Sequence, residues 1–319
     1  SSFVSKTKSS PFKLSTSFKV LKVSIFFTSE ISLFLGILFL FMQKYLMETS
    51  IKSYFKTTKI MVLISACFSI LFYNKSVFPM YMEVTTFTSL FYVLTCFVMF
   101  LWLSLSVKWF VSEDLEPFYF CILSLFATLC FSIIIKAVDL KVLFVGLSIL
   151  SFVNYKMLKF SQQTEEFHNG SKRYAVVSLM FVLMMLFSIC FLGSDNTYYA
   201  KASEIVGMSD IKMSIFIFIS VIFFVLFLLN LAPLHFCFAD MVAPAVLPVA
   251  SYLNLVPLFA LFACFVKLNT TIFMPIKLEL DSVYTYFGIF SLLLGAVGAN
   301  SSRNLRKIFA YGGIYNLGM

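Results

Sequence analysis

The chain has 319 residues, of which 61% are hydrophobic and 12% are charged, and its formal net charge is +9. This composition excludes a water-soluble globular domain, in which roughly twice as many residues are charged. Apolar runs of about 20 residues, the length at which a helix crosses a bilayer, recur along the chain and favour helices over a transmembrane barrel. The sequence therefore predicts an all-α, polytopic transmembrane helical bundle of nine to ten helices, with no soluble catalytic domain.

The N-terminal part of the chain is expected to hold a basic extension and three helices. Residues 1–22 contain five lysines, seven serines and no acid, which resembles a transit-peptide remnant or a basic flank that stays on one face of the membrane. Residues 23–110 form the next unit, with a polar linker over 44–59. The three helices are expected at 23–42, 60–73 and 89–110. Glu30, near the start of the first, either caps the helix, faces a neighbouring subunit or takes part in chemistry.

Five further helices are expected in the middle of the chain, over residues 111–267. Their ranges are 118–135, 140–158, 174–193, 213–230 and 247–266. A polar loop over 159–173 separates the second of these from the third. Residues 268–319 then contain a loop, a ninth helix over 282–298 and the opening of a tenth helix at Ile308. The tenth is too short to span a bilayer by itself. We expect it to be completed elsewhere or to end inside a larger assembly.

The seventh helix is predicted to break at Pro233. Proline removes a backbone hydrogen bond from a helix, and a broken helix at membrane depth is tolerated only where protein or a water-filled cavity surrounds it. His235 and Asp240 follow the break, and an ionisable residue in such a place is a candidate for function. The alternative is a kinked helix that ends in a short loop at the membrane surface.

The cysteines do not indicate a metal or redox site. All seven lie singly in or beside apolar stretches, without metal-site or C-x-x-C spacing: Cys67, Cys96, Cys121, Cys130, Cys190, Cys237 and Cys264. Buried thiols of this kind behave as small hydrophobic side chains. The sequence contains no Gly-rich phosphate loop, iron–sulfur cysteine set or haem ligand pair, so no metal or cofactor is expected to bind to this chain.

Three stretches of the sequence carry the motifs of one family. They are APLHFCFADMVAPAVLPV, NSSRNLRKIFAYGGIYNLGM and EPFYFCILSLFATLCFSIIIKAVDLKVLFVGLSILSFVNYKML. The matching residues are Pro233, His235, Asp240, Pro248 and Val249; Arg306 or Lys307, Ala310, Tyr311, Ile314 and Gly318; and Phe118, Tyr119, Asp139, Leu140, Ser151 and Tyr155. In order and spacing they resemble NADH dehydrogenase subunit 2, an antiporter-like membrane subunit of respiratory complex I.

The resemblance covers roughly the N-terminal two-thirds of the family protein and implies a repeat architecture. One complete five-helix antiporter-like repeat would occupy 111–267, and an incomplete second repeat would begin within 268–319. The family places a glutamate in the fifth helix, a lysine before the broken seventh helix and a lysine in the eighth. This sequence has Ser148, Leu228 and Leu258 at those positions. The resemblance therefore implies a proton half-channel that has lost its central charges.

Proton transfer through a membrane needs titratable groups linked by water. The remaining candidates are His235 in the break, Lys136 and Asp139 at a helix end, and Lys172 at the start of the sixth helix. Each has a structural alternative. His235 could bond to carbonyls freed by the break, Lys136 and Asp139 could be a solvated turn pair, and Lys172 could be a positive-inside anchor.

The resemblance implies a membrane-arm subunit of the proton-pumping NADH:ubiquinone oxidoreductase, contributing scaffold and a degenerate half-channel but no catalytic residue. NADH, FMN, iron–sulfur clusters and ubiquinone would then bind elsewhere in the complex. The alternatives are a stand-alone cation/proton antiporter-like transporter and a structural subunit of another respiratory assembly.

The expected partners are other complex I membrane-arm subunits, membrane lipids and a second polypeptide that completes the fold after Met319; no nucleic acid is expected. A split gene, or a chain that continues beyond Met319, would account for the short tenth helix. The 42 phenylalanines, with lysine far in excess of arginine, indicate an A+T-rich organelle genome. We therefore expect a multi-pass protein of the mitochondrial inner membrane.

Overall fold

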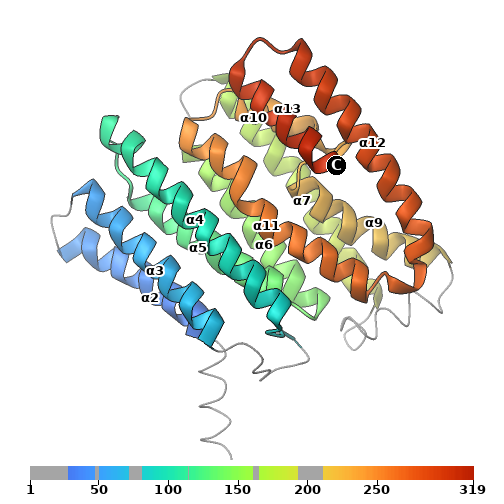
Figure 1. Cartoon of the computed structure of the whole chain (residues 1–319), viewed down its shortest axis with the longest axis horizontal. Helices are drawn as coiled ribbons and strands as arrows, with labels where there is room; N and C mark the ends of the chain where they lie inside the picture. The colour runs from blue at the N-terminus through green and yellow to red at the C-terminus, as the bar shows by residue number, and fades with distance from the viewer. Residues whose placement is uncertain (1–27, 47–49, 72–80, 114, 161–164, 193–210) are drawn as a thin grey trace, which may run out of the picture.

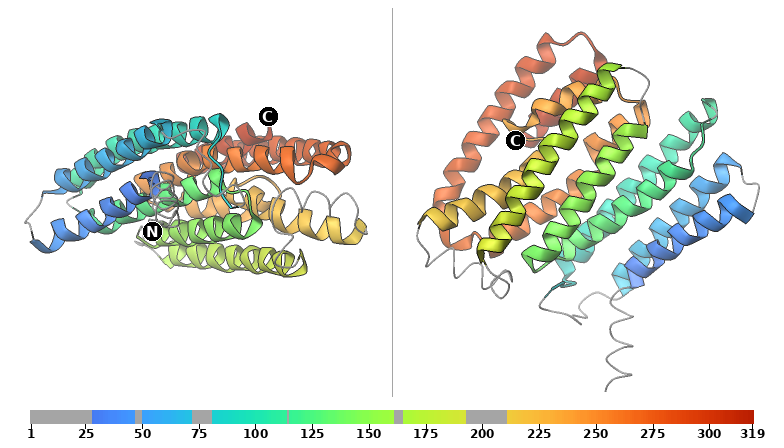
Figure 2. Two further views of the ribbon diagram at one scale, coloured as in Figure 1. Left: turned by 90° about the horizontal axis from the view of Figure 1, so that it is seen from below. Right: turned by 180° about the vertical axis from the view of Figure 1, so that it is seen from behind.

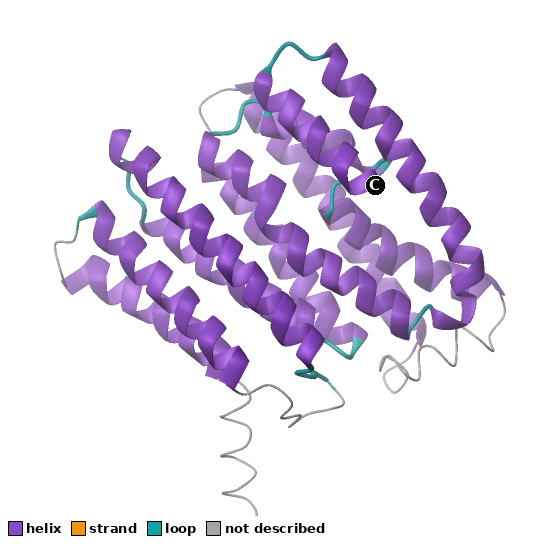
Figure 3. Ribbon diagram, in the orientation of Figure 1, coloured by secondary structure: helices purple, strands orange, loops and turns teal. Residues whose placement is uncertain are grey.

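The computed structural model describes residues 28–46, 50–71, 81–113, 115–160, 165–192 and 211–319 (Figure 1). Nearly all of these residues are helical and none forms a strand, which confirms the all-α prediction (Figure 3). The basic extension over 1–22 lies outside the described residues.

The helices follow the apolar runs of the sequence. Their bounds are α2 Thr28–Leu46, α3 Ile51–Leu71, α4 Thr86–Ser112, α5 Phe118–Lys136, α6 Leu140–Phe160, α7 Glu165–Leu192, α9 Ile211–Leu228, α10 Phe238–Val242, α11 Leu247–Thr271, α12 Lys277–Ser301 and α13 Leu305–Gly318, with short 3-10 turns η1 Leu234–Cys237 and η2 Met274–Ile276. Within the described ranges, eight helices are long and apolar enough to cross a bilayer. The prediction of a polytopic membrane bundle is confirmed.

Helices extend into three segments that were expected to be a polar linker or loops, and those predictions were wrong. Helix α3 begins at Ile51, inside the expected linker over 44–59. Its first turns place Lys52 and Lys56 on the exposed face while Phe55 is buried, an arrangement in which lysine stems lie along apolar surface and their charges reach water. Helix α7 likewise begins inside the expected loop over 159–173, and α12 inside that over 268–280.

The helices pack in two layers around α5. Seen from below, α3, α4, α11 and α12 lie in one layer and α6, α7 and α9 in the other (Figure 2). Helix α5 contacts α2, α3, α4, α6 and α11. Of its membrane-spanning stretch 72% is buried inside the protein, compared with 11% for that of α12. Polar side chains on α5 therefore lie in the interior of the protein, whereas most of α12 faces lipid or a neighbouring chain.

Candidate functional site

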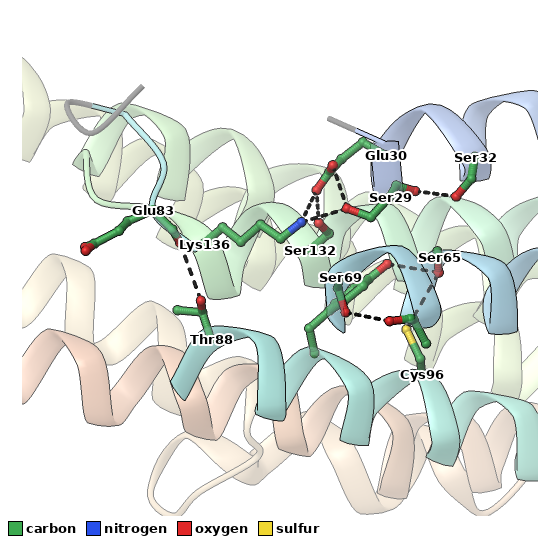
Figure 4. A network of polar contacts seen from close by, with 12 residues as sticks. Ser29, Glu30, Ser32, Ser65, Ser69, Glu83, Thr88, Cys96, Ser132 and Lys136 are labelled. Atoms are coloured by element: carbon green, nitrogen blue, oxygen red, sulfur yellow. Dashed lines mark hydrogen bonds and ion pairs between the residues drawn. The ribbon is translucent and has the colours of Figure 1, made fainter. Parts of the chain in front are cut away.

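A buried ion pair joins α2 to α5. Glu30 lies in the first turn of α2 and Lys136 is the last residue of α5. Lys136 Nζ lies 2.6 Å from Glu30 Oε1, and the two side chains are 2% and 12% exposed, respectively (Figure 4). An acid and a base more than a hundred residues apart thus neutralise each other inside the bundle, where an isolated charge would be costly.

Hydroxyl groups complete the surroundings of this pair. Lys136 Nζ donates to Ser29 Oγ at 2.8 Å, and Ser29 Oγ donates in turn to Glu30 Oε2 at 2.8 Å. The Ser132 hydroxyl donates to Glu30 Oε1. The ammonium group also lies 5.1 Å from the centre of the Tyr92 ring, within cation–π range. Both carboxylate oxygens and the ammonium group therefore have polar partners.

The polar cluster continues into the interface between α3 and α4. The Tyr92 hydroxyl donates to Ser65 Oγ at 3.2 Å, and Cys96 Sγ lies 3.8 Å from the same oxygen (Figure 4). All three side chains are buried. The four helices α2 to α5 thus enclose one connected polar patch at the end of the bundle where α2 begins.

Backbone pairing closes this end of the bundle. The Glu83 amide donates to the Lys136 carbonyl at 2.8 Å, and the Val138 amide donates to the Tyr81 carbonyl at 2.9 Å. These two bonds form an isolated antiparallel bridge between Met82 and Ala137. The segment before α4 therefore covers the turn between α5 and α6 and keeps solvent from Lys136.

The structural alternative for Lys136 and Asp139, a solvated turn pair, was wrong. Both residues are buried, and the segment before α4 pairs with the turn that holds them. Asp139 Oδ1 accepts a hydrogen bond from the Lys141 amide at 2.8 Å and so satisfies the start of α6. Lys136 thus belongs to the ion pair, whereas Asp139 has a capping role.

The predicted break after the seventh helix is present. Helix α9 ends at Leu228, Asn230 has a φ of 62°, and the peptide bond before Pro233 is cis. His235 lies in η1, where its ring centre is 6.5 Å from that of Tyr311 on α13. Its Nδ1 atom is buried and has no hydrogen-bond partner among the described residues. The imidazole therefore does not bond to a freed carbonyl through Nδ1.

Two side chains from other helices hold the segment that follows the break. Arg306, in the first turn of α13, donates to the carbonyls of Ala245 at 2.8 Å and Ala243 at 3.5 Å. Trp102 on α4 donates through Nε1 to the Pro248 carbonyl at 2.9 Å, in the first turn of α11. The carbonyls of Ala243 and Ala245, which lie between α10 and α11, are thus satisfied by a distant part of the chain, and Trp102 joins α4 to the start of α11.

The positions at which the family motifs carry charge form no charged path here. Ser148 on α6 donates to the Phe144 carbonyl of its own helix and lines an open groove of about 380 Å³ between α6 and α7. Leu228 is 5% exposed in the hydrophobic core, and Leu258 packs against that core from α11. Lys172 is exposed on α7. His235 lies beside α13, and no contact joins it to Lys136 or Lys172.

Sequence reasoning found the individual ionisable residues but missed the pairing of Glu30 with Lys136. One available signal was the four-residue spacing of Ser124, Thr128, Ser132 and Lys136, which places three hydroxyl groups and a cation on one face of a largely apolar helix. Arg306 and Trp102 were also missed as supports of the break. Within the described part of the chain, no group of three or more His, Cys, Asp or Glu side chains is arranged to hold a metal ion.

Sequence comparison places relatives among bacterial respiratory proteins. The chain is 22% identical over 206 residues to NADH-quinone oxidoreductase subunit N of Hirschia baltica, covering 65% of this chain and 43% of that protein. It is 26% identical over 198 residues to subunit N of Sphingopyxis alaskensis, covering 61% and 42%. The chain thus spans less than half the length of these relatives.

Solved structures show the same fold. Respiratory complex I of Thermus thermophilus contains a chain that matches with a TM-score of 0.69 and 15% identity, over 91% of this chain and 62% of that one. The Mrp complex of Dietzia sp. gives a TM-score of 0.69 and 16% identity, over 93% and 57%. The archaeal membrane-bound sulfane sulfur reductase gives 0.72 and 16%, over 93% and 63%.

The profile of one transmembrane family, described as NADH:quinone oxidoreductase/Mrp antiporter, matches residues 137–319, more than half of the sequence. This match includes the broken helix with His235 and begins directly after Lys136. The chain belongs to the NADH:quinone oxidoreductase/Mrp antiporter transmembrane family.

Proposed function

We propose that this protein is a membrane-arm subunit of a proton-pumping NADH:quinone oxidoreductase, in the position of subunit 2. Family membership, relatives named as subunit N of that enzyme and the helix broken at Pro233 support the proposal. The chain would take part in the enzyme without binding NADH, FMN, iron–sulfur clusters or quinone. Its partners would be other membrane-arm subunits and lipids.

Within that enzyme, the proposed role of the chain is mainly scaffold, with a degenerate central half-channel. The observation that carries this proposal is Leu228, which is buried in the hydrophobic core where the family motif has a lysine. Ser148 and Leu258 likewise carry no charge. A proton needs titratable groups or ordered water to cross an apolar interior, and leucine offers neither.

A mitochondrial inner-membrane location, with the gene in an organelle genome, is the proposal that the Phe- and Lys-rich composition supports. That a second polypeptide completes the helices after Met319 stays a prediction.

Native gel electrophoresis tests the proposed assembly. Membranes that contain the chain would be solubilised in a mild detergent, and the gel would be stained for NADH dehydrogenase activity. Co-migration of the chain with that activity is expected. Migration as a free protein would instead indicate a stand-alone cation/proton antiporter, and migration with a different respiratory activity would indicate a structural subunit of another assembly.

Replacing His235 by alanine tests the degenerate channel. The ratio of protons pumped to electrons transferred is expected to stay at the wild-type value, because positions 148, 228 and 258 carry no charge that could pass a proton to or from His235. A clear drop in that ratio, in a complex assembled to normal levels, would show that the central path still conducts.

A further inference from the structure

We propose that Glu30 and Lys136 form a proton-exchange site, which binds and releases one proton at the end of the bundle where α2 begins. The site lies outside residues 137–319, the part of the chain that matches the family profile. It is therefore separate from the central positions 148, 228 and 258. The existence of this exchange site does not depend on the proposed function. A contribution of the site to proton pumping does depend on it.

The geometry allows a proton to move within the pair by two routes. In the first, the Lys136 N–H bond breaks and an O–H bond forms on Glu30 Oε1, across the 2.6 Å contact. In the second, Lys136 Nζ gives a proton to Ser29 Oγ while the Ser29 hydroxyl gives its own to Glu30 Oε2. Either route converts an ammonium–carboxylate pair into an amine and a carboxylic acid, with no change in total charge.

The difference in exposure between the two side chains gives the exchange a direction. Glu30 is 12% exposed, whereas Lys136 is 2% exposed. The carboxylic acid can therefore pass its proton to water, which leaves a carboxylate and an amine, and the reverse steps reload the pair. In the proposed exchange, Glu30 releases the proton because it is the more exposed member, and Lys136 supplies it.

Further ionisable side chains lie at the same end of the bundle as the pair. Lys267 on α11 donates to the carbonyl of Ile135, the residue before Lys136, at 3.4 Å. Among the described residues, these groups include Tyr92 and Cys96 on α4, Glu83 before α4, which interacts electrostatically with Lys267, and Asp139 and Lys141 at the start of α6.

Holding α2 against α5 does not require ionisable side chains. Replacing a buried ion pair by well-packed apolar residues is often neutral or stabilising. The two helices already pack through apolar contacts, since an added Cβ at Gly36 would lie 3.3 Å from a methyl group of Leu125 on α5. A site for an exchangeable proton, in contrast, needs an acid, a base and hydroxyl groups that stabilise both charge states, which is the set found here.

Chemical labelling tests whether Glu30 takes up a proton. Dicyclohexylcarbodiimide is an apolar reagent that modifies protonated carboxyl groups inside membranes. Intact membranes would be treated over a range of pH, and modification of Glu30 would be measured by mass spectrometry of peptides. We expect labelling of wild-type Glu30 that increases as the pH falls. An unlabelled Glu30 at every pH, with label on the Lys136→Met variant, would identify a fixed ion pair and overturn the proposal, as would absence of label from both.

Matched variants separate exchange from structural support. Glu30→Gln and the double variant Glu30→Gln/Lys136→Met remove the exchangeable groups and leave a neutral site. Glu113→Gln and Lys156→Met are the controls, because both side chains are exposed and lie outside the polar cluster. The double variant is expected to assemble at the wild-type level, because neither charge is left without a partner.

Proton pumping is the second readout. In complexes assembled to normal levels, we expect Glu30→Gln and the double variant to lower the ratio of protons pumped to electrons transferred, and the control variants to leave it unchanged. An unchanged ratio in the double variant would overturn a contribution to pumping. If the chain does not migrate with NADH dehydrogenase activity, the proposed function fails, and the labelling of Glu30 still decides whether the exchange site exists.

Discussion

At the scale of single residues, buried polar groups set the requirements that the fold has to meet. Lys136 and Trp102 both place a polar nitrogen in an apolar interior, and each nitrogen has partners on another helix. An unpaired group in such a place loses its interaction with water and gains nothing in return. Substitutions that remove one partner are therefore expected to cost more than substitutions that remove both.

Lys136→Met alone is expected to destabilise the protein by up to about 3 kcal/mol, because it leaves the Glu30 carboxylate without its cation. The loss falls at lower pH, since a protonated carboxyl group needs no counter-ion. Adding Glu30→Gln should restore most of the stability. Thermal unfolding of the solubilised variants measures both effects. A double variant as unstable as Lys136→Met would contradict this account.

Trp102→Phe is expected to destabilise the protein by about 0.5–1.5 kcal/mol, the net contribution of one hydrogen bond, because the Pro248 carbonyl loses the indole donor but keeps the Ser251 hydroxyl. Trp109→Phe is a matched control, since Trp109 is less buried and, within the described residues, its side chain donates no hydrogen bond to another helix. Denaturation of the two variants in the same detergent gives the comparison. Equal losses would show that ring packing, and not the hydrogen bond, links α4 to α11.

At the scale of helices, close packing of α13 on α12 positions the segment after the break. A Cβ atom at Gly295 would lie 2.8 Å from the backbone nitrogen and 2.9 Å from the Cα of Tyr315. Backbone atoms cannot rotate away as a flexible side chain can. The two helices therefore approach so closely that only glycine fits at this position, and α13 carries Arg306 to the carbonyls of Ala243 and Ala245.

Gly295→Ala is expected to destabilise the pair of helices by about 1–3 kcal/mol, the usual cost of overpacking. Gly312→Ala is the control, because a Cβ there meets nothing within 4 Å; it should be neutral or slightly stabilising, since alanine favours helix. Hydrogen exchange of the α13 amides measures the effect. Equal protection in both variants would show that α13 can move away from α12 without loss.

The sequence predicted the helices well where composition alone decides them. Runs of apolar residues fixed α4, α5, α6 and α11 to within a few residues, and Pro233 predicted the break. The start of α3 differs from the prediction because Lys52, Lys56 and Lys59 give this stretch the polar composition of a linker. Their spacing of four and three residues is that of one helix face, which was a usable signal.

The ion pair could not be predicted in the same way. Nothing local in the sequence states which lysine an acid in another helix will meet, because that choice depends on how α2 packs against α5. The same holds for Arg306, whose partners are carbonyls with no sequence signature. Sequence patterns predict secondary structure and burial, but partner choice between distant segments follows from packing.

At the scale of the whole molecule, successive helices alternate in direction, which places each connecting segment on one of the two sides of the membrane. Helices α4, α5 and α6 run antiparallel in turn, so the end of α4 lies at the opposite end of the bundle from Lys136 (Figure 1). Helix α11 ends near Lys136, since Lys267 reaches the Ile135 carbonyl. The two sides of the membrane can therefore be assigned to named residues.

Single cysteines at Glu113 and Thr270, both exposed positions, are expected to react with a membrane-impermeant maleimide from opposite sides. The exposed native thiols Cys67 and Cys190 would first be replaced by serine. Labelling of sealed vesicles of each orientation gives the result. Reaction of both positions from the same side would contradict the alternating arrangement.

The short bridge between Met82 and Ala137 also constrains how the protein is made. Its two strands of backbone are separated by the whole of α4 and α5, so a nascent chain cannot form it until both helices have left the ribosome and entered the bilayer. Until then the backbone amide groups of Glu83 and Val138 can form hydrogen bonds only with water. This region is therefore expected to fold in helix pairs. The pair formed by α4 and α5 reaches its final packing only after the turn that follows α5 has been synthesised.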